Sequence, residues 1–263
     1  MGVLNVTPDS FSDGGYYFEP DKAIEHGIEM AEAGADIIDI GGESTRPYSR
    51  RLSANEETDR VIPVIESLKK ELSIPICIDT YKADVARDAM ISGASMINDI
   101  SALRFDPQMA LVAAKATVPV ILMHMKGTPE NMQENPSYYD LIPDIVGFLK
   151  DAIERSVKAG IREDLIIVDP GIGFGKTFED NLKIIKDLSR FGALKRPVLV
   201  GTSDKAFIGH ILGKKVGERD TGTMATISYA VTTGAHIVRV HNVKNTKETV
   251  QIIDAIISGK VDP

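Results

Sequence analysis

The stretch IPICIDTYKADVARDAMISGASMINDI, residues 74–100, contains two short isoleucine-rich runs separated by an amphipathic segment. The runs IPICID (74–79) and SMINDI (95–100) each contain an aspartate near their end, and the apolar residues of 82–92 have helical spacing. Parallel strands need a crossover of about a dozen residues, usually a helix. The stretch therefore predicts a strand, a helix and a second strand parallel to the first.

The same unit recurs along the whole chain. Strand-like runs are found at 3–6, 36–42, 74–79, 95–100, 118–125, 165–171, 197–201 and 236–241. Helix-like segments follow near 21–33, 54–72, 82–92, 107–116, 138–159, 178–189, 219–233 and 245–258. Eight such units in 263 residues predict an α/β fold, a (β/α)₈ TIM barrel in a single domain over 1–263. A doubly wound open sheet is the alternative, but no linker divides the chain.

Composition and charge limit the possible partners. The formal net charge of −8 and the pI of about 5.2 disfavour nonspecific binding to nucleic acid. Cys77 is the one cysteine, so neither an internal disulfide nor a cysteine-based zinc site can form, and a reducing compartment such as the cytoplasm is expected. No apolar run approaches the roughly 20 residues that cross a bilayer, so no membrane partner is expected.

Polar residues follow the predicted strands. They are Asn5, Asp39, Asp79, Asn98, Asp99, His124, Asp169, Ser203, Lys205, Arg239 and His241. Because barrel enzymes carry their chemistry at the carboxyl ends of the strands, these side chains predict a site on one rim. Acids suit a ring with N–H donors, whereas arginine and histidine suit phosphate or carboxylate.

Each of these residues also has a simpler interpretation. An aspartate or asparagine at a strand end is usually a turn former or a helix cap, and Asp99 is interpreted in this way. Cys77 is interpreted as a core residue. For His124, which lies in the apolar run LMHM, a core position and a site position are equally compatible with the sequence.

Two other signals concern phosphate and metal binding. The segment GIGFGKT (171–177) fails the phosphate-loop spacing because Pro170 stands where glycine is needed, so its glycines predict a tight loop that a flat ligand approaches. No histidine pattern indicates a tightly held transition metal. Carboxylates and amides would suit Mg²⁺ held partly by substrate phosphates.

The chain resembles the dihydropteroate synthase family of folate biosynthesis over nearly its whole length. The resemblance is carried by MGVLNVTPDSFSDGG (1–15), DIGGESTRP (39–47), IDT (78–80), INDI (97–100), LMHM (122–125), MQ (132–133), DPGIGFGKT (169–177), SDKAFIG (203–209) and RVH (239–241). It implies a transferase that joins 6-hydroxymethyl-7,8-dihydropterin diphosphate to p-aminobenzoate and releases diphosphate. An SN1-like displacement, inhibition by sulfonamides and a homodimer are further expectations.

The resemblance also implies a role for each matching residue. The catalytic, pterin-holding positions are Asp79, Asn98, Asp169 and Lys205, and Asn5 matches the contact to Mg²⁺ and diphosphate. Residues expected to bind substrate are Thr45, Arg46, Pro47, Phe11, Phe174, Ser203, Arg239 and His241. Of these, Arg239 and His241 match the diphosphate-binding pair, and Phe11, Thr45, Arg46, Pro47 and Phe174 surround the aminobenzoate.

The chain departs from the family pattern at three places, Tyr48, Asp204 and Asn242. Asp204 is expected to pair with Arg50 or Arg51. The upstream segment usual in the family is expected to be absent. A catalytically divergent pterin-binding paralogue and a corrinoid-dependent methyltetrahydrofolate methyltransferase are the alternatives.

Overall fold

Parallel strands alternate with helices along the chain in this computed structural model, which describes residues 1–7, 20–44 and 49–260. The strands are β1 Gly2–Asn5, β2 Ile38–Gly41, β3 Ile76–Asp79, β4 Met96–Asp99, β5 Val120–Met123, β6 Ile166–Asp169, β7 Leu199–Val200 and β8 Ile237–Val238. The helices are α2 Pro20–Glu32, α3 Ala54–Glu71, α4 Ala83–Ser92, α5 Met109–Ala116, α6 Leu141–Lys158, α7 Phe178–Lys186, α8 Ala206–Leu212, α9 Asp220–Thr232 and α10 Val243–Ser258.

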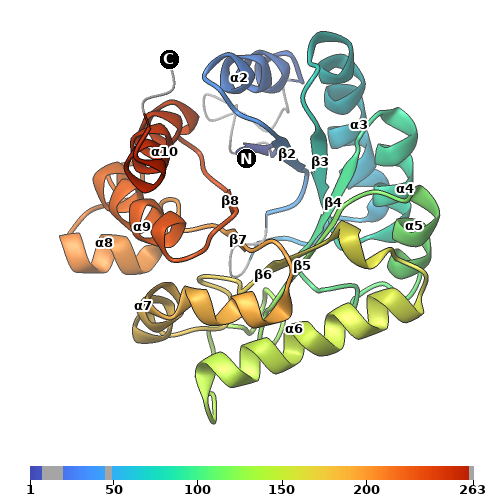
Figure 1. Cartoon of the computed structure of the whole chain (residues 1–263). Coiled ribbons are helices and arrows are strands. Elements are labelled where there is room, and N and C mark those ends of the chain that lie inside the picture. Colours follow the sequence, from blue (N-terminus) through green and yellow to red (C-terminus); the bar gives the residue numbers. More distant parts are fainter. Residues whose placement is uncertain (8–19, 45–48, 261–263) are drawn as a thin grey trace.

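The strands close into a barrel with the helices around it (Figure 1). Strands β1 to β6 form one parallel sheet in sequence order, and β7 pairs with β8 in a second sheet. Parallel bridges from Val168 to Val198 and from Gly2 to Val240 join the two sheets. The Val3 amide donates to the Val240 carbonyl at 2.9 Å across the second junction. The predicted (β/α)₈ barrel is confirmed, and α8 is an additional helix between β7 and α9.

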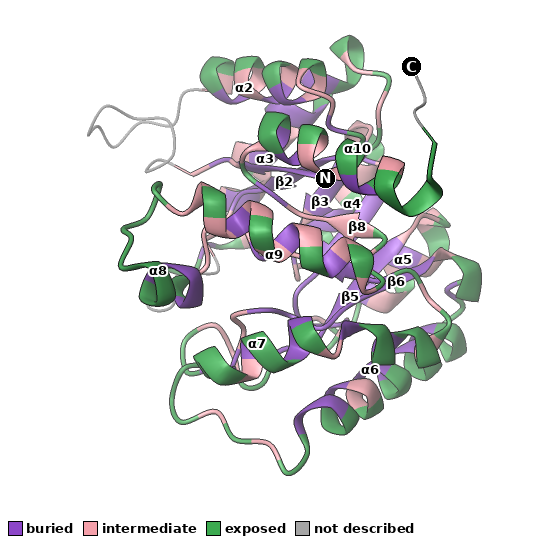
Figure 2. Ribbon diagram, turned by 60° about the vertical axis from the view of Figure 1, so that its left-hand side comes forward, coloured by how far each residue is buried: buried purple, intermediate pink, exposed green. Residues whose placement is uncertain are grey.

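The helices bury one face against the strands and expose the other (Figure 2). In α3, Val61, Val64, Ile65 and Leu68 are buried at helical spacing. A capping box starts this helix: the Glu56 amide donates to Ser53 Oγ at 3.2 Å, and the Ser53 amide donates to Glu56 Oε2 at 2.9 Å. None of the helices in the described ranges is long and apolar enough to cross a membrane.

The interior of the barrel is filled by its own apolar side chains. A cluster separate from the main core consists of Met1, Cys77, Met96, Ile121, Ile167 and Leu199. Strand side chains alternate, so Ile76 and Ile78 point to the helices while Cys77 points inward. The interpretation of Cys77 as a core residue is confirmed. A packed interior leaves the rim above it as the place for polar side chains.

Candidate active site

Strand register brings the predicted rim residues side by side. Asn5 aligns with Gly41, Gly41 with Asp79, and Asp79 with Asn98. Asp169 ends β6 opposite Met123 of β5. Residues far apart in the sequence therefore end their strands at one level of the barrel.

The floor of this rim site is an ion-pair network around Arg239, which follows β8. Arg239 Nε donates to Asp39 Oδ2 at 2.5 Å, and Nη2 donates to Asp79 Oδ2 at 2.7 Å. Asn98 Nδ2 donates to the same Asp39 oxygen at 3.2 Å. The Asp39 side chain is fully buried, whereas the Arg239 side chain is 24% exposed and so stays accessible from the rim.

Burial changes the charge balance of this network. Burial lowers the pKa of Arg239, but Asp39 and Asp79 outweigh that effect and raise it above its ordinary value. Burial raises the pKa of Asp79 strongly; Arg239 opposes the rise and Asp39 adds to it. The guanidinium thus stays charged while holding a carboxyl group that gains a proton more readily than usual.

Asp169 and Lys205 lie on the β6 and β7 side of the site, where each charge influences the pKa of the other. Burial raises the pKa of Asp169 to about 6, although the Gly171 amide donates to its Oδ1 at 2.7 Å. Burial lowers the pKa of Lys205 to about 8, and Arg239 adds to this effect. Lys205 Nζ lies 4.5 Å from the centre of the Phe174 ring, a cation–π contact that directs the ammonium group toward the loop after β6.

Ser203 and His241 are brought together beside β7 and β8. Ser203 Oγ and His241 Nδ1 are 2.9 Å apart, and the His241 amide donates to Ser203 Oγ at 3.3 Å. The neighbouring Asn242 accepts from the Asn245 amide at the start of α10 and donates to Asp220 Oδ2 at 2.6 Å. Asn242 is thus a helix cap that also ties α10 to α9.

His124 is buried and contacts Lys176 of the loop after β6, which agrees with the core interpretation. It is buried, and its pKa is lowered to about 2 by burial and by Lys176, so the ring is neutral. Lys176 is buried as well; its Nζ lies 3.0 Å from His124 Nδ1 and donates to the Phe174 carbonyl at 2.9 Å. The pair attaches the loop after β6 to the end of β5.

The glycines of the loop after β6 serve mainly the contact between two loops. Gly171 has φ +71°, and a Cβ there would lie 1.9 Å from the His124 carbonyl oxygen. Gly175 has φ +66°, and a Cβ there would meet the Lys126 carbonyl oxygen at 2.5 Å. The expected tight loop is confirmed at both positions, where the close neighbour is backbone from the β5 side. That a flat ligand approaches this loop stays a prediction. Gly173 borders Lys205 instead.

The expected pairing of Asp204 with Arg50 or Arg51 is wrong. Asp204 has φ +57°, and its carbonyl accepts from Arg219 Nη1 at 2.9 Å while its Oδ1 lies 3.8 Å from Arg219 Nε. Arg50 pairs with Glu56 and Arg51 with Glu130, both at 2.7 Å. Asp204 therefore holds Arg219, the residue directly before α9. The sequence shows which cations could pair with Asp204 but not which of them lies beside it in the fold.

Several predicted residues lie outside the part of the chain that the structure describes. They are Phe11, Thr45, Arg46 and Pro47, together with the departure at Tyr48. Asp39 was among the polar residues expected on the rim, but no role was predicted for it, and in the structure it anchors Arg239. Lys176, which attaches the loop after β6 to His124, was not singled out from the sequence. The signal for Asp39 was an acid placed between isoleucines inside a strand, since such an acid needs a buried cationic partner.

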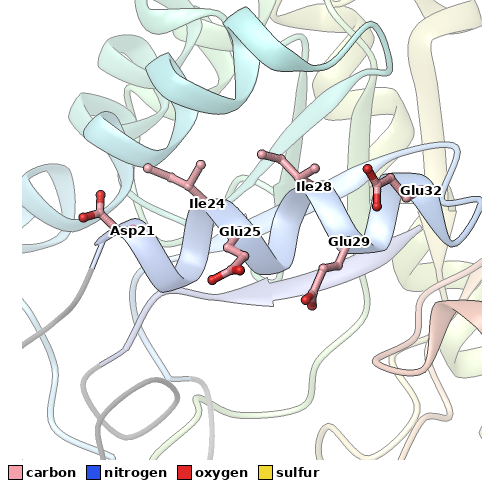
Figure 3. A pocket seen from close by; sticks show the side chains of 6 residues that line it. All are labelled: Asp21, Ile24, Glu25, Ile28, Glu29 and Glu32. Carbon is pink, nitrogen blue, oxygen red and sulfur yellow. The ribbon is translucent and has the colours of Figure 1, made fainter.

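A surface cavity of about 500 Å³ lies elsewhere on the molecule. Its lining residues are Asp21, Ile24, Glu25, Ile28, Glu29 and Glu32, which all belong to α2 (Figure 3). None of them is a predicted site residue. The rim network, which combines buried acids with cations, is the better candidate for chemistry.

Known proteins resemble this chain over nearly its whole length. The model of the pterin binding enzyme family matches residues 1–241. Dihydropteroate synthase of Bacillus subtilis is 50% identical over 258 residues, covering 98% of this chain and 88% of the relative. The Yersinia pestis dihydropteroate synthase solved with a sulfonamide drug is 45% identical with a TM-score of 0.93, covering 98% of this chain and 93% of that one. The Xanthomonas albilineans dihydropteroate synthase solved with 4-aminobenzoic acid is 41% identical with a TM-score of 0.92, covering 98% of this chain and 92% of that one.

The chain belongs to the pterin binding enzyme family. The function and enzyme class predicted from the sequence, those of a dihydropteroate synthase of folate biosynthesis and a transferase, are confirmed.

Replacing Gly171 by alanine should destabilise the protein. The substitution puts a Cβ at positive φ against the His124 carbonyl, so we expect a loss of at least about 2 kcal/mol in the free energy of unfolding. Gly147, inside α6 with nothing within 4 Å of its Cβ position, is the matched control. Its alanine variant should gain about 0.5–1 kcal/mol. Denaturant titration measures both, and equal effects would contradict this interpretation.

The stability of the protein should depend on pH through Lys176, whose pKa burial lowers from 10.5 to about 7. Between pH 7 and pH 10.5 the Lys176 side chain is protonated in the unfolded chain and neutral in the folded one. The free energy of unfolding therefore rises with pH over this range, and the gain is absent below pH 7. The free energy of unfolding of wild type minus that of Lys176→Met should therefore grow by roughly 2–4 kcal/mol from pH 7 to pH 10. The same substitution at exposed Lys150 is the control. A difference that stays flat for Lys176 over this range would show that the lysine titrates normally.

Proposed function

We propose that this rim site joins 6-hydroxymethyl-7,8-dihydropterin diphosphate to p-aminobenzoate and releases diphosphate, in an SN1-like displacement without a covalent enzyme intermediate. The observation that carries the proposal is Arg239 held between Asp39 and Asp79, with Asn98 on the same Asp39 oxygen. Acceptors for a pterin and a cation for its leaving group then share one site.

Departure of diphosphate requires cations that absorb its charge. Arg239 keeps further N–H donors beyond those that contact Asp39 and Asp79, and its side chain is partly exposed. His241 lies two residues after Arg239 in the chain, and its ring contacts Ser203. We assign both to the diphosphate, as the resemblance implies.

The positive charge left on the pterin methylene would be stabilised by carboxylates beneath the ring. Asp79 and Asp169 both lie at strand ends, and burial raises the pKa of each. Their ionised forms are costly in this environment, and that cost is lowered when a cationic ring lies over them. Lys205, beside Phe174, is assigned to the ring edge together with Asn98.

Mg²⁺ fits this site as an ion that arrives with the diphosphate. The described residues contain no cluster of three or more acidic, histidine or cysteine side chains that would hold a metal alone. Mg²⁺ commonly takes few protein ligands and completes its shell with phosphate oxygens and water. Asn5, half-buried at the end of β1, would supply its side-chain amide oxygen as a protein ligand, and the ion would neutralise charge on the leaving group.

The arylamine would attack from above the ring. The resemblance assigns Phe174, Phe11 and the segment Thr45 to Pro47 to p-aminobenzoate, and a sulfonamide would compete for the same place.

A homodimer and a cytoplasmic location are part of the proposal. Exposed isoleucines on α10, Ile252 and Ile256, would suit a second copy, and a single buried cysteine suits a reducing compartment.

The Asp79→Asn variant should lose turnover. An amide in place of the carboxylate removes the negative charge beneath the developing cation, so kcat should fall by about 100-fold or more. The control is Asp36→Asn, which lies before β2 at the other end of the strand, is 78% exposed and pairs with Lys247. The assay follows diphosphate release with and without p-aminobenzoate.

Normal turnover in Asp79→Asn would exclude this role. Pterin binding by the wild type without diphosphate release would instead indicate the catalytically divergent paralogue.

A further inference from the structure

The backbone on both sides of Phe174 is held by side chains from the segment between β5 and α6. Gln133 Nε2 donates to the Gly173 carbonyl at 2.8 Å, and Tyr138 Oη donates to the Gly175 carbonyl at 2.6 Å. These pairs are 40 and 37 positions apart in the chain. The conformation of the loop around Phe174 therefore depends on a distant segment, to which the proposed reaction assigns no role.

The carbonyl of Phe174 itself is held by Lys176. Lys176 Nζ donates to this carbonyl at 2.9 Å. The same nitrogen lies 3.0 Å from His124 Nδ1 and 3.4 Å from the His124 carbonyl oxygen. Lys176 is only 2% exposed, and His124 follows directly after β5. The lysine thus holds Phe174 to the end of a barrel strand.

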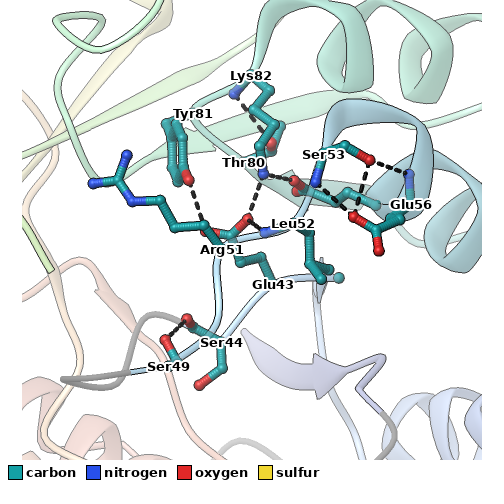
Figure 4. A network of polar contacts seen from close by, with 12 residues as sticks. Glu43, Ser44, Ser49, Arg51, Leu52, Ser53, Glu56, Thr80, Tyr81 and Lys82 are labelled. Atoms are coloured by element: carbon teal, nitrogen blue, oxygen red, sulfur yellow. Dashed lines mark hydrogen bonds and ion pairs between the residues drawn. The ribbon is translucent and has the colours of Figure 1, made fainter. Parts of the chain in front are cut away.

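Lys82, which follows β3, shows a different way of burying a lysine (Figure 4). Its Nζ donates to Glu43 Oε2 at 2.5 Å and also pairs with Glu57, so carboxylates balance its charge. The groups that contact Lys176 Nζ are two carbonyls and a neutral imidazole ring. Burying a lysine against uncharged groups is costly. Departures of this kind are expected at functional sites.

The ring of Phe174 connects this loop to the rim site. It packs against a buried apolar cluster that includes Met123, at the end of β5, and Met132. The centre of the ring lies 4.5 Å from Lys205 Nζ. A change in the position of the Phe174 backbone would therefore be felt at the rim.

We infer that Lys176 is a positioning residue for p-aminobenzoate, acting through Phe174. This inference rests on the proposed function, in which Phe174 borders p-aminobenzoate and Lys205 contacts the pterin. The carboxyl groups of Asp79 and Asp169 stand at the ends of their own strands. Loss of the Lys176 contacts should therefore weaken the use of p-aminobenzoate more than the use of the pterin diphosphate.

A role in stability alone predicts a different outcome. Lys176→Met would then change the free energy of unfolding and leave both KM values of the folded enzyme unchanged. Ser53→Ala is the control for such a case, because it removes the capping box that Ser53 forms with Glu56 at the start of α3 (Figure 4). Helix α3 packs against α2, α4 and β2.

The kinetic test compares Lys176→Met, Gln133→Met and Ser53→Ala with the wild type. Lys176→Met keeps an unbranched apolar stem and removes the donor, so the KM for p-aminobenzoate should rise at least about tenfold. Gln133→Met removes the exposed donor to the Gly173 carbonyl and should raise this KM at least about threefold. The KM for the pterin diphosphate should stay within about twofold in all three variants.

A readout without turnover separates this inference from the proposed function. Because the Lys205 side chain ends over the Phe174 ring, the ring current shifts the NMR signals of the Lys205 ε-methylene protons. Phe174→Leu removes this shift and so gives its full size. We expect Lys176→Met to lose at least about half of it and Ser53→Ala to keep it.

Three results would overturn the positioning role. They are an unchanged KM for p-aminobenzoate, equal changes in both KM values, and a Lys205 signal that stays at its wild-type position in Lys176→Met. If Lys176→Met fails to fold, Gln133→Met decides by the same measurements. An inactive wild type whose Lys205 signal still responds to Lys176→Met would count against the proposed function alone.

Discussion

The guanidinium of Arg239, shared between the buried carboxylates of Asp39 and Asp79, is the interaction on which the rest of the site depends. It joins residues 200 and 160 positions apart in the chain. It also spans the junction where β8 meets β1 and the barrel closes. Burying an acid such as Asp39 is costly unless a cation lies beside it, and Arg239 supplies that cation from the last strand of the barrel. The contact that satisfies Asp39 therefore also links the end of β8 to β2 and β3.

The surrounding rim follows from the same constraint. The apolar cluster that includes Cys77, Ile121 and Leu199 fills the barrel below the rim. The carboxyl groups of Asp79 and Asp169 are therefore poorly solvated. Burial then raises the pKa of Asp79 and Asp169 and lowers that of Lys205. In the reaction we propose, carboxyl groups whose charge is costly would be stabilised more by a cationic pterin methylene than by the neutral pterin ring.

Much of this arrangement could be predicted from the sequence, and the remainder has identifiable causes. Repeated strand and helix units predicted the barrel, and strand-end polarity predicted Asp79, Asn98, Asp169 and Arg239, because period and register are local properties. The partner of Asp204 was wrong because long-range pairing needs the path of α8 and α9, which brings Arg219 to it. The glycines of the loop after β6 predicted a tight loop, but the sequence could not show that the backbone of His124 and Lys126 is what packs against it. The anchoring role of Asp39 also depends on closure, which no single segment encodes.

We infer that Arg239 and Asp39 act as one unit in the reaction. A double-mutant cycle with Asp39→Asn and Arg239→Met, followed by kcat/KM for diphosphate release, measures their coupling directly. We expect a coupling energy of at least about 1.5 kcal/mol, as found for close charge pairs, because either single variant already disrupts the shared network. Additive losses in the double variant would contradict it and would mean that the two side chains contribute independently.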